Sequence, residues 1–246
     1  MNKILPAEKV MRMLFIWTLF FCASLNADVL FTDSFDGPAV DPNKWNTVLP
    51  YGDSAVSQAS GSLHLERQGG VFTAAAYSQP FELTGTFINH NVYSLLTVVL
   101  RSDESNSNND YKAANGIHVV FWGPLGFSEG GRIDIRVEDP LITNWGTNLA
   151  VNPEDQHSFR IVDTGSSVRV EFNGSLIVDY QTTFSLGGKV GFFSRDSRDN
   201  FGPGPSRWEG DTEILSAQIS NVPEPSSLSL LALGAVALAI NKRRRA

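Results

Sequence analysis

The chain has a single cysteine, and its position excludes several kinds of site. Cys22 lies inside an apolar stretch near the N-terminus. If that stretch is removed on export, the remainder of the chain contains no thiol. The middle of the chain therefore has no disulfide framework and no cysteine-based metal or catalytic site.

Positive charge is also scarce in the middle of the chain. The whole sequence has 19 Lys and Arg against 26 Asp and Glu, and its net charge is −7. Seven of the bases but only two of the acids lie in the terminal segments, so residues 28–221 carry about 24 acids and about 12 bases. Such an acidic surface repels phosphate backbones and anionic lipid. We therefore expect no nucleic-acid partner.

Long apolar runs are confined to the two ends. The first, Met13–Leu25, has about 13 residues, fewer than the roughly 20 that span a bilayer as a helix. Three positive residues precede it and the small residue Ala27 follows it. This order is typical of a secretory signal peptide. We predict that residues 1–27 are such a signal and that the protein is exported.

The second run, Leu228–Ile240, would form a helix roughly 20 Å long, thin for a bilayer core. The basic cluster Lys242–Arg245 follows it and should stay on the cytoplasmic side, which places the rest of the chain outside. We expect a short transmembrane helix here. The residues that precede the run form a Pro-Glu-Pro motif: Val222, Pro223, Glu224 and Pro225.

This order of motif, apolar helix and terminal Arg cluster resembles the PEP-CTERM sorting signal. The resemblance covers about the last 25 residues, 222–246. It implies recognition by an exosortase, a membrane transpeptidase-like enzyme of Gram-negative bacteria that produce exopolysaccharide. The expected location is the cell envelope, outer surface or extracellular matrix, with membrane anchoring before any processing. A plain tail anchor is the alternative.

Between the two ends, short β-rich runs alternate with Gly, Pro, Asn and Asp clusters, and no segment shows sustained helical periodicity. Roughly a dozen strands at this spacing predict an all-β sandwich or barrel. The expected strands are 29–35, 62–67, 71–77, 81–89, 94–101, 116–121, 132–137, 158–163, 167–172, 176–180, 189–194 and 213–220. Asn173-Gly174 between the ninth and tenth favours a tight type I′ hairpin turn, since both residues tolerate positive φ.

Two stretches resemble the concanavalin A-like, laminin-G-like jelly rolls. They are Ser158–Arg195, with its Asn-Gly hairpin and Gly-Lys-Val-Gly-Phe-Phe-Ser-Arg ending, and the opening Phe31–Gly37 with Asp41 and Trp45 after it. The resemblance implies a two-sheet antiparallel jelly-roll sandwich over residues 28–221, with apolar helices at both ends of the chain.

The same opening resembles family-16 glycoside hydrolases, whose acids lie on one strand face as Glu-x-Asp-x-(x)-Glu. The nearest counterpart here is Arg132–Glu138, and only Asp134 matches. Arg132 stands at the nucleophile position and Glu138 lies too far along. The resemblance therefore implies a non-catalytic relative, with a glycoside hydrolase as the weaker alternative.

Metal-ligand patterns are weak in the sequence. The four histidines, His64, His90, His118 and His157, are dispersed without paired spacing, and we interpret each as a strand-surface or loop residue. Oxygen ligands of the kind that Ca²⁺ prefers, unlike the histidines, lie close together in the sequence near the first and last strands. The candidates are Asp33, Asp36 and the Gly37 carbonyl near the first strand, with Asp211 and Glu213 at the start of the last strand. Ordinary turn chemistry for Asp36-Gly37 and solvation for the rest are the competing interpretation. No other cofactor is expected.

Aromatic residues in loop contexts suggest a carbohydrate-binding site. An indole can stack on the apolar face of a sugar while amides supply hydrogen bonds. Capping of the sandwich core is the alternative for each tryptophan, and Trp45 fits the core best. The candidate ligand-binding residues are Trp122, Trp145, Trp208, Tyr111, Asn115 and Asn144.

Taken together, these patterns predict an exported, envelope-sorted, non-catalytic carbohydrate-binding or extracellular-matrix component. Two alternatives stay open: a structural or adhesive surface protein without a specific glycan, and a glycoside-hydrolase-like enzyme. The expected partners are an exosortase-like sorting enzyme and extracellular polysaccharide, with the membrane contacted through the C-terminal helix.

Overall fold

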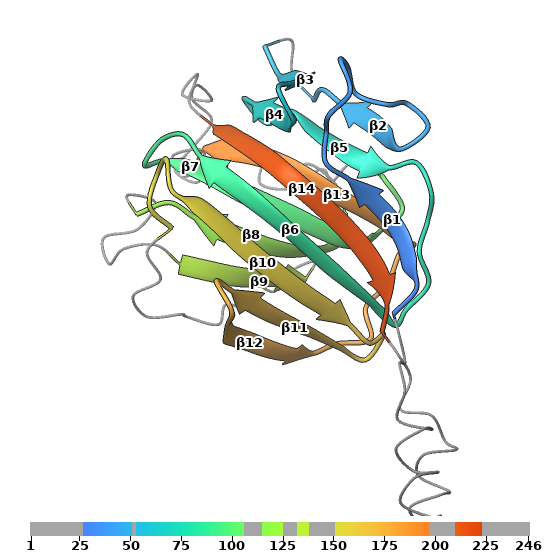
Figure 1. Ribbon diagram of the computed structural model, residues 1–246. Helices are drawn as coiled ribbons and strands as arrows, with labels where there is room; N and C mark the ends of the chain where they lie inside the picture. The colour runs from blue at the N-terminus through green and yellow to red at the C-terminus, as the bar shows by residue number, and fades with distance from the viewer. Residues whose placement is uncertain are drawn as a thin grey trace, which may run out of the picture. The chain divides into compact units, whose positions relative to one another are not determined.

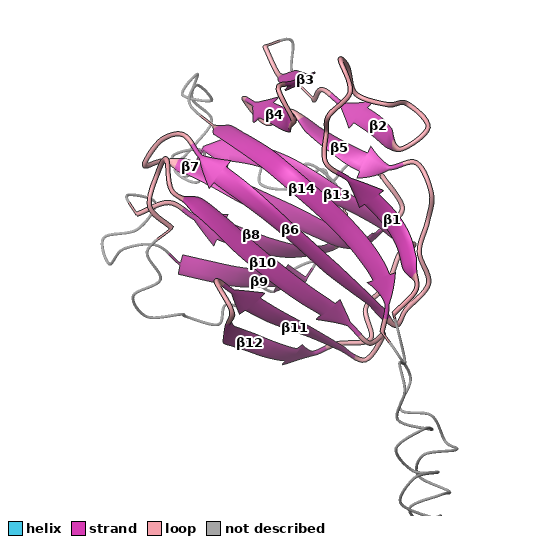
Figure 2. Cartoon of the chain, viewed as in Figure 1, coloured by secondary structure: helices cyan, strands magenta, loops and turns pink. Residues whose placement is uncertain are grey.

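The computed structural model describes residues 27–50, 53–105, 115–124, 132–137, 151–196 and 210–222. Nearly all of them belong to one compact unit, Val29–Asn221. Every regular element in these ranges is a strand, as Figure 2 shows. No helix within them is long and apolar enough to cross a membrane. The expected terminal helices, 13–25 and 228–240, lie outside the described residues.

The strands form two antiparallel sheets (Figure 1). The eight-stranded sheet contains β12 (Ser175–Gln181), β11 (Ser167–Phe172), β10 (Gln156–Asp163), β6 (Phe81–Asn89), β14 (Asp211–Asn221), β4 (Ser62–Glu66) and β3 (Ala55–Ala59), with β1 (Val29–Asp33) beside β14. The six-stranded sheet contains β2 (Trp45–Val48), β5 (Gly70–Thr73), β13 (Lys189–Asp196), β7 (Ser94–Ser102), β8 (Ile117–Trp122) and β9 (Arg132–Val137).

The last strand, β14, organises the larger sheet. One edge of β14 pairs with β6 along its length. The other edge is shared, because residues 211–214 pair with β4 and residues 217–220 pair with β1. Non-consecutive neighbours of this kind, within two facing antiparallel sheets, confirm the predicted jelly-roll sandwich.

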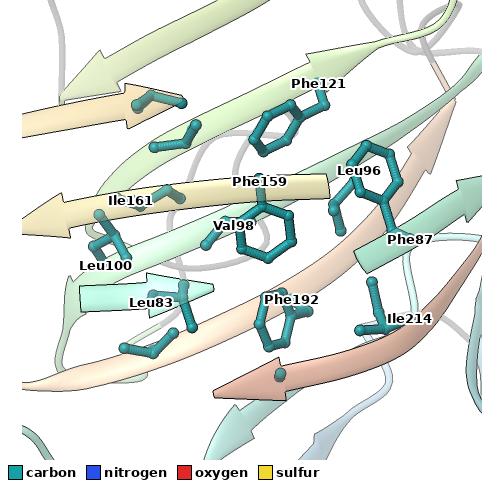
Figure 3. Packing of buried hydrophobic residues seen from close by; sticks show 14 of the residues in the cluster. Leu83, Phe87, Leu96, Val98, Leu100, Phe121, Phe159, Ile161, Phe192 and Ile214 are labelled. Carbon is teal, nitrogen blue, oxygen red and sulfur yellow. The ribbon is translucent and has the colours of Figure 1, made fainter. Parts of the chain in front are cut away.

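The core lies between the sheets and is rich in phenylalanine. Figure 3 shows Phe87 and Phe159 of the eight-stranded sheet gathered with Phe192, Leu96 and Val98 of the six-stranded sheet. Phe121 of β8 lies with its ring centroid 5.6 Å from that of Phe159 of β10, so aromatic contacts join the two sheets. Burial of these side chains supplies most of the free energy that holds the sheets together.

The outward faces of the two sheets differ. Along β6, buried and partly exposed residues alternate, so one face of the larger sheet packs on the core and the other meets solvent. Every residue of β7 and β8 is buried. Outward-facing apolar side chains there form two small clusters separate from the main core: Phe72, Val99 and Phe193, and Leu95, Val120 and Trp122.

All twelve predicted strands are present, with ends that differ by a few residues. Two further strands, β2 (Trp45–Val48) and β3 (Ala55–Ala59), were not predicted. Both lie at the edge of a sheet and contain few buried residues, so they lack the apolar alternation that reveals a strand in sequence.

The predicted hairpin is confirmed. Asn173 and Gly174 have φ values of 47° and 77°, as a type I′ turn requires, and they join β11 to β12. The Asn173 side chain also accepts a hydrogen bond from the backbone N–H of Ser158 at 2.9 Å. The turn is therefore fixed to β10 as well.

Candidate functional site

A group of ionisable side chains lies on the solvent-facing surface of the eight-stranded sheet. His64 comes from β4, Glu213 from β14, and His90 follows the last residue of β6. Leu63, Leu65 and Ile214 point into the core, which turns their neighbours His64 and Glu213 outward. Asn89, the residue before His90, is also fully buried. His64 and Glu213 are direct cross-strand partners. We call His64, His90 and Glu213 the histidine cluster.

The three side chains converge on the Glu213 carboxylate. His90 Nε2 lies 3.1 Å from Glu213 Oε2, and His64 Nε2 lies 3.5 Å from Glu213 Oε1. The two imidazole rings are nearly parallel, with an interplanar angle of 6°. One ligand atom from each residue lies within 4.8 Å of the others, and all three side chains are partly buried.

Neighbouring groups hold the cluster in place. Glu154 Oε2 lies 3.1 Å from His90 Nδ1, on the side of the ring opposite Glu213. The backbone fixes both residues, because Glu154 N–H donates to Asn89 O at 2.9 Å and His90 N–H donates to Asp211 O at 3.0 Å. Ser62 Oγ lies 3.0 Å from His64 Nε2.

The electrostatics of the cluster favour a cation. Burial alone would lower the pKa of His90, but the hydrogen bond to Glu154, the nearby charges of Asp211 and Glu154, and the hydrogen bond to Glu213 together raise it. The pKa of Asp211 is also raised, chiefly by burial and further by the charge of Glu66, against the opposing effect of the two histidines. Three carboxylates, Glu154, Glu213 and Asp211, therefore act on His90, and Glu66 acts on Asp211.

The interpretation of each histidine as a strand-surface or loop residue fits His64 and His90 and is wrong for His118 and His157, which are buried. The four histidines are also not all dispersed in space. His64 and His90 are brought together with Glu213 by the pairing of β4 and β6 with β14. Sequence spacing could not show this, because Glu213 is about 150 residues from His64. The other two histidines, His118 and His157, are buried in different parts of the sandwich.

The predicted calcium ligands do not form one group. The last strand does lie beside the first, but Asp33 pairs with Ala217, six residues along β14 from Asp211. At about 3.3 Å a residue, Asp211 is about 20 Å away. Asp33 also has an evident structural role, because its carboxylate accepts hydrogen bonds from Trp45 Nε1 at 2.7 Å and from the backbone N–H of Phe35 at 3.0 Å.

The other two candidates of that set, Asp36 and Gly37, take part in turn contacts. Ser34 Oγ donates to Asp36 Oδ2 at 2.5 Å, and Gln58 Nε2 donates to the Gly37 carbonyl at 2.9 Å. These contacts fit the turn chemistry that was the competing interpretation.

The structure places two of the six predicted ligand-binding residues. Trp122 is only 1% exposed and packs with Leu95 and Val120, so its indole has no open face for a sugar. Asn115 closes a loop, because its backbone N–H and its side-chain amide donate to Ser105 O and Oγ, each at 2.9 Å. The remaining four lie outside the described residues: Tyr111, Asn144, Trp145 and Trp208.

The segment compared with hydrolase acids is β9, at one edge of the six-stranded sheet. The backbone of Arg132 pairs with Trp122 and that of Asp134 with Val120. Ile133 between them is buried in the main core. The register positions of Arg132 and Asp134 therefore belong to the face of the sheet opposite the core. Glu138 lies outside the described residues.

Comparison with known proteins identifies the tail and the fold. Residues 221–245 match the model of the PEP-CTERM protein-sorting motif. A search of curated protein sequences finds no match.

Solved structures resemble the domain across most of its length. One, from work on endo-acting O-glycanases of the human gut microbiota, has a TM-score of 0.61 at 14% identity and covers 79% of this chain and 100% of its own. The Emp47p carbohydrate recognition domain has a TM-score of 0.57 at 13% identity, covering 79% and 97%. SCLam, a GH16 endo-β-1,3(4)-glucanase, has a TM-score of 0.59 at 9% identity, covering 80% and 92%.

Identities this low establish a shared fold and nothing about activity. The sorting motif indicates export and targeting to the bacterial envelope. The protein thus combines a PEP-CTERM sorting motif at residues 221–245 with a jelly-roll domain of the concanavalin A-like type.

Proposed function

We propose that this protein is a non-catalytic carbohydrate-binding or extracellular-matrix component of the bacterial envelope. The observation that carries the proposal is the joining of an envelope-sorting motif to a fold shared by a carbohydrate recognition domain and by glucanases. In this proposal an exosortase-like enzyme recognises the tail, the membrane holds it before processing, and the domain meets extracellular polysaccharide.

The sequence of β9 supports a non-catalytic role. A retaining glycosidase needs two carboxyl groups about 5–5.5 Å apart, one of them the nucleophile. Arginine stands at position 132, where the resemblance to family-16 enzymes requires that nucleophile, and only Asp134 of the three acids is kept. An arginine cannot attack an anomeric carbon, since its guanidinium stays protonated.

The proposed ligand-binding residues are now the four candidates other than Trp122 and Asn115. Stacking on an exposed indole with a few hydrogen bonds must overcome the cost of immobilising the sugar. We therefore expect weak binding, with dissociation constants roughly between micromolar and millimolar. Binding of a neutral glycan should be insensitive to salt, because no counterions are displaced.

A glycan panel tests the proposal. The full chain, purified in mild detergent, is applied to immobilised polysaccharides while soluble products are assayed in parallel. Saturable binding without product supports the proposal, and loss of binding in Trp145→Ala or Trp208→Ala with an unchanged melting temperature would assign the site. Release of oligosaccharide would instead indicate a hydrolase. If no glycan in the panel is bound and no product is released, the result would favour a structural or adhesive surface protein.

A further inference from the structure

We propose that His64, His90 and Glu213 form a binding site for a divalent transition-metal ion of the zinc type. The proposal is independent of carbohydrate binding, because it concerns the solvent-facing surface of the eight-stranded sheet and uses none of the residues considered for a glycan. It rests on four features of the histidine cluster: the ligand types, their spacing, the contacts of His90, and the scaffold.

The ligand types select the metal. Two imidazole nitrogens and one carboxylate suit Zn²⁺ and its neighbours, whereas Ca²⁺ takes oxygen ligands almost exclusively. Three protein ligands leave a fourth tetrahedral position for water. The imidazoles of His64 and His90 are 32% and 26% exposed, so an ion can reach them from solvent.

The spacing fits a tetrahedral ion. Ligands about 2.0–2.1 Å from zinc are about 3.3–3.4 Å from one another in a regular tetrahedron. His90 Nε2 lies 3.1 Å from Oε2 of Glu213, and His64 Nε2 lies 3.5 Å from the other oxygen, Oε1. Each imidazole is therefore near that separation from one of the two carboxylate oxygens. The ligand atoms of the two histidines lie within 4.8 Å of each other, so metal binding requires the two imidazole nitrogens to move to about 3.3 Å apart.

The contacts of His90 call for a cation. Both of its ring nitrogens face carboxylate oxygens at 3.1 Å, Nδ1 facing Glu154 and Nε2 facing Glu213. A neutral imidazole has one N–H and one lone pair, so one of these contacts would set a lone pair against a carboxylate. Either a second proton or a metal ion must lie between them.

Glu154 is placed as the outer partner of a metal-binding histidine. Histidine ligands usually donate their other ring N–H to a carboxylate, which fixes the tautomer and orients the ring. Here the Glu154 carboxylate accepts a hydrogen bond from His90 Nδ1, so the lone pair of His90 is on Nε2. That nitrogen faces Glu213, where the metal ion would lie. The orienting group belongs to a different segment, just before β10, and its backbone N–H donates to Asn89 O, beside His90.

The scaffold is rigid. His64 and Glu213 are paired on adjacent strands. The residue before His90, Asn89, is fully buried, and its side chain accepts a hydrogen bond from Thr212 Oγ1 at 3.0 Å. A site built on paired strands keeps its ligands in place before the metal arrives, which lowers the entropic cost of binding.

Zinc titration of the full chain, purified without a polyhistidine tag and stripped with a chelator, tests the proposal. We expect one Zn²⁺ per chain by calorimetry and a rise in melting temperature with Zn²⁺, because an ion that binds only the folded state stabilises it. Co²⁺ should give the visible absorption of a tetrahedral site, and excess Ca²⁺ should not displace Zn²⁺.

Variants distinguish the site from adventitious binding. Glu213→Gln, His64→Ala and His90→Ala should each abolish the stoichiometric binding and the rise in melting temperature. Glu154→Gln, which removes only the orienting carboxylate, should weaken binding by about 10–100-fold. Glu171→Gln is the matched control, since Glu171 is a strand carboxylate of the same sheet, 18% exposed against 17% for Glu213, and should bind zinc as the wild type does.

Two results would overturn the proposal. One is a wild-type chain that folds, as shown by circular dichroism, but binds no stoichiometric Zn²⁺. The other is zinc binding that survives in both Glu213→Gln and the folded double variant His64→Ala with His90→Ala. Glycan binding is read separately, so its loss or retention in the parallel panel does not bear on the metal.

Discussion

At the scale of single residues, burial separates structural from functional side chains. Trp122 and Trp45 are both almost fully buried, and the indole N–H of Trp45 is satisfied by Asp33. An aromatic residue in a loop-like sequence context can therefore be a packing residue. Its exposure in the structure decides whether it packs in the interior or is free to bind a ligand. Trp122, a buried aromatic residue, and Asp163, a buried charged residue, each give a prediction about stability.

Trp122→Ala should destabilise the domain. The indole is 1% exposed and packs with Leu95 and Val120, so its removal leaves a cavity and should cost about 3–5 kcal/mol in the free energy of unfolding. Chemical denaturation would measure the loss. Leu176→Ala is the control, because Leu176 is 51% exposed and should change stability by less than about 0.5 kcal/mol. Equal losses in the two variants would contradict a packing role for Trp122.

Asp163→Asn should also be strongly destabilising. Arg101 Nε and NH2 donate to the two oxygens of Asp163 at 2.9 Å and 2.6 Å, and both side chains are buried. Removing the negative charge leaves the guanidinium buried without its counter-charge, which costs about 3–5 kcal/mol. In Glu82→Gln the half-exposed pair with Arg160 is broken, and that loss should be at most about 1 kcal/mol. Urea unfolding of both variants would show the difference.

At the scale of elements, turns and strand pairs set both the shape and the histidine cluster. The β11–β12 hairpin is local and depends on two residues in left-handed conformations. The cluster depends on β14, which joins β4 and β6. Each arrangement gives a prediction.

Gly174→Ala should cost about 1 kcal/mol in stability. Gly174 has φ of 77°, and nothing lies within 4 Å of an added Cβ, so the cost comes from the backbone conformation alone. Gly174→Asn should cost less, since asparagine tolerates left-handed φ. Thermal melts of both variants beside Ser175→Ala, a substitution in the same hairpin, would check this order. A neutral Gly174→Ala would contradict the type I′ geometry.

The histidine cluster should make metal-free stability depend on pH. The pKa of His90 is raised in the folded state above the ordinary value of about 6.5, so its stabilising contribution is full below about pH 6.5 and is lost as the pH rises through the folded value. The raised pKa of Asp211 acts in the same direction at lower pH. The groups around His90 are Glu154, Glu213, Asp211, His64 and Glu66.

His90→Gln tests this dependence. In the presence of a chelator, the wild type should exceed His90→Gln in unfolding free energy by more at about pH 6 than at about pH 9. Denaturant titrations at the two pH values give the comparison. Glu171→Gln, which lies outside the cluster, should show a constant difference from the wild type. A constant difference for His90→Gln as well would show that its charge is not stabilised by the cluster.

At the scale of the whole molecule, the domain and its tail have separate tasks. The sorting motif indicates delivery to the envelope, and the jelly-roll domain is what is delivered. Residues 28–221 carry about 24 acids and about 12 bases, and a net charge far from zero favours solubility.

Processing of the tail can be observed directly. If the motif is cleaved during sorting, mass spectrometry of the native envelope protein should find chains ending between Val222 and Ser227. Replacing Lys242–Arg245 with neutral residues should also impair membrane orientation, because the positive-inside rule predicts that this cluster stays on the cytoplasmic side. A mature chain that retains Ala246 would indicate a simple anchor in place of a cleaved sorting signal.

The sequence by itself determined the properties that depend on local patterns. Short β-rich runs between Gly, Pro, Asn and Asp clusters predicted twelve strands, and Asn173-Gly174 predicted a type I′ turn. The succession of Pro-Glu-Pro motif, apolar run and basic cluster at the C-terminus predicted the sorting motif. Each of these signals lies within a few consecutive residues, where side-chain period, φ preference or charge order acts directly.

The tertiary structure decided what depends on pairing between distant strands. Trp122 is buried in a cluster with Leu95 of the paired strand β7, and the separation of Asp211 from Asp33 follows from the register of β1 on β14. The histidine cluster exists because β14 joins β4 to β6. Strand register is set by the burial of whole faces, so no short stretch of sequence carries it.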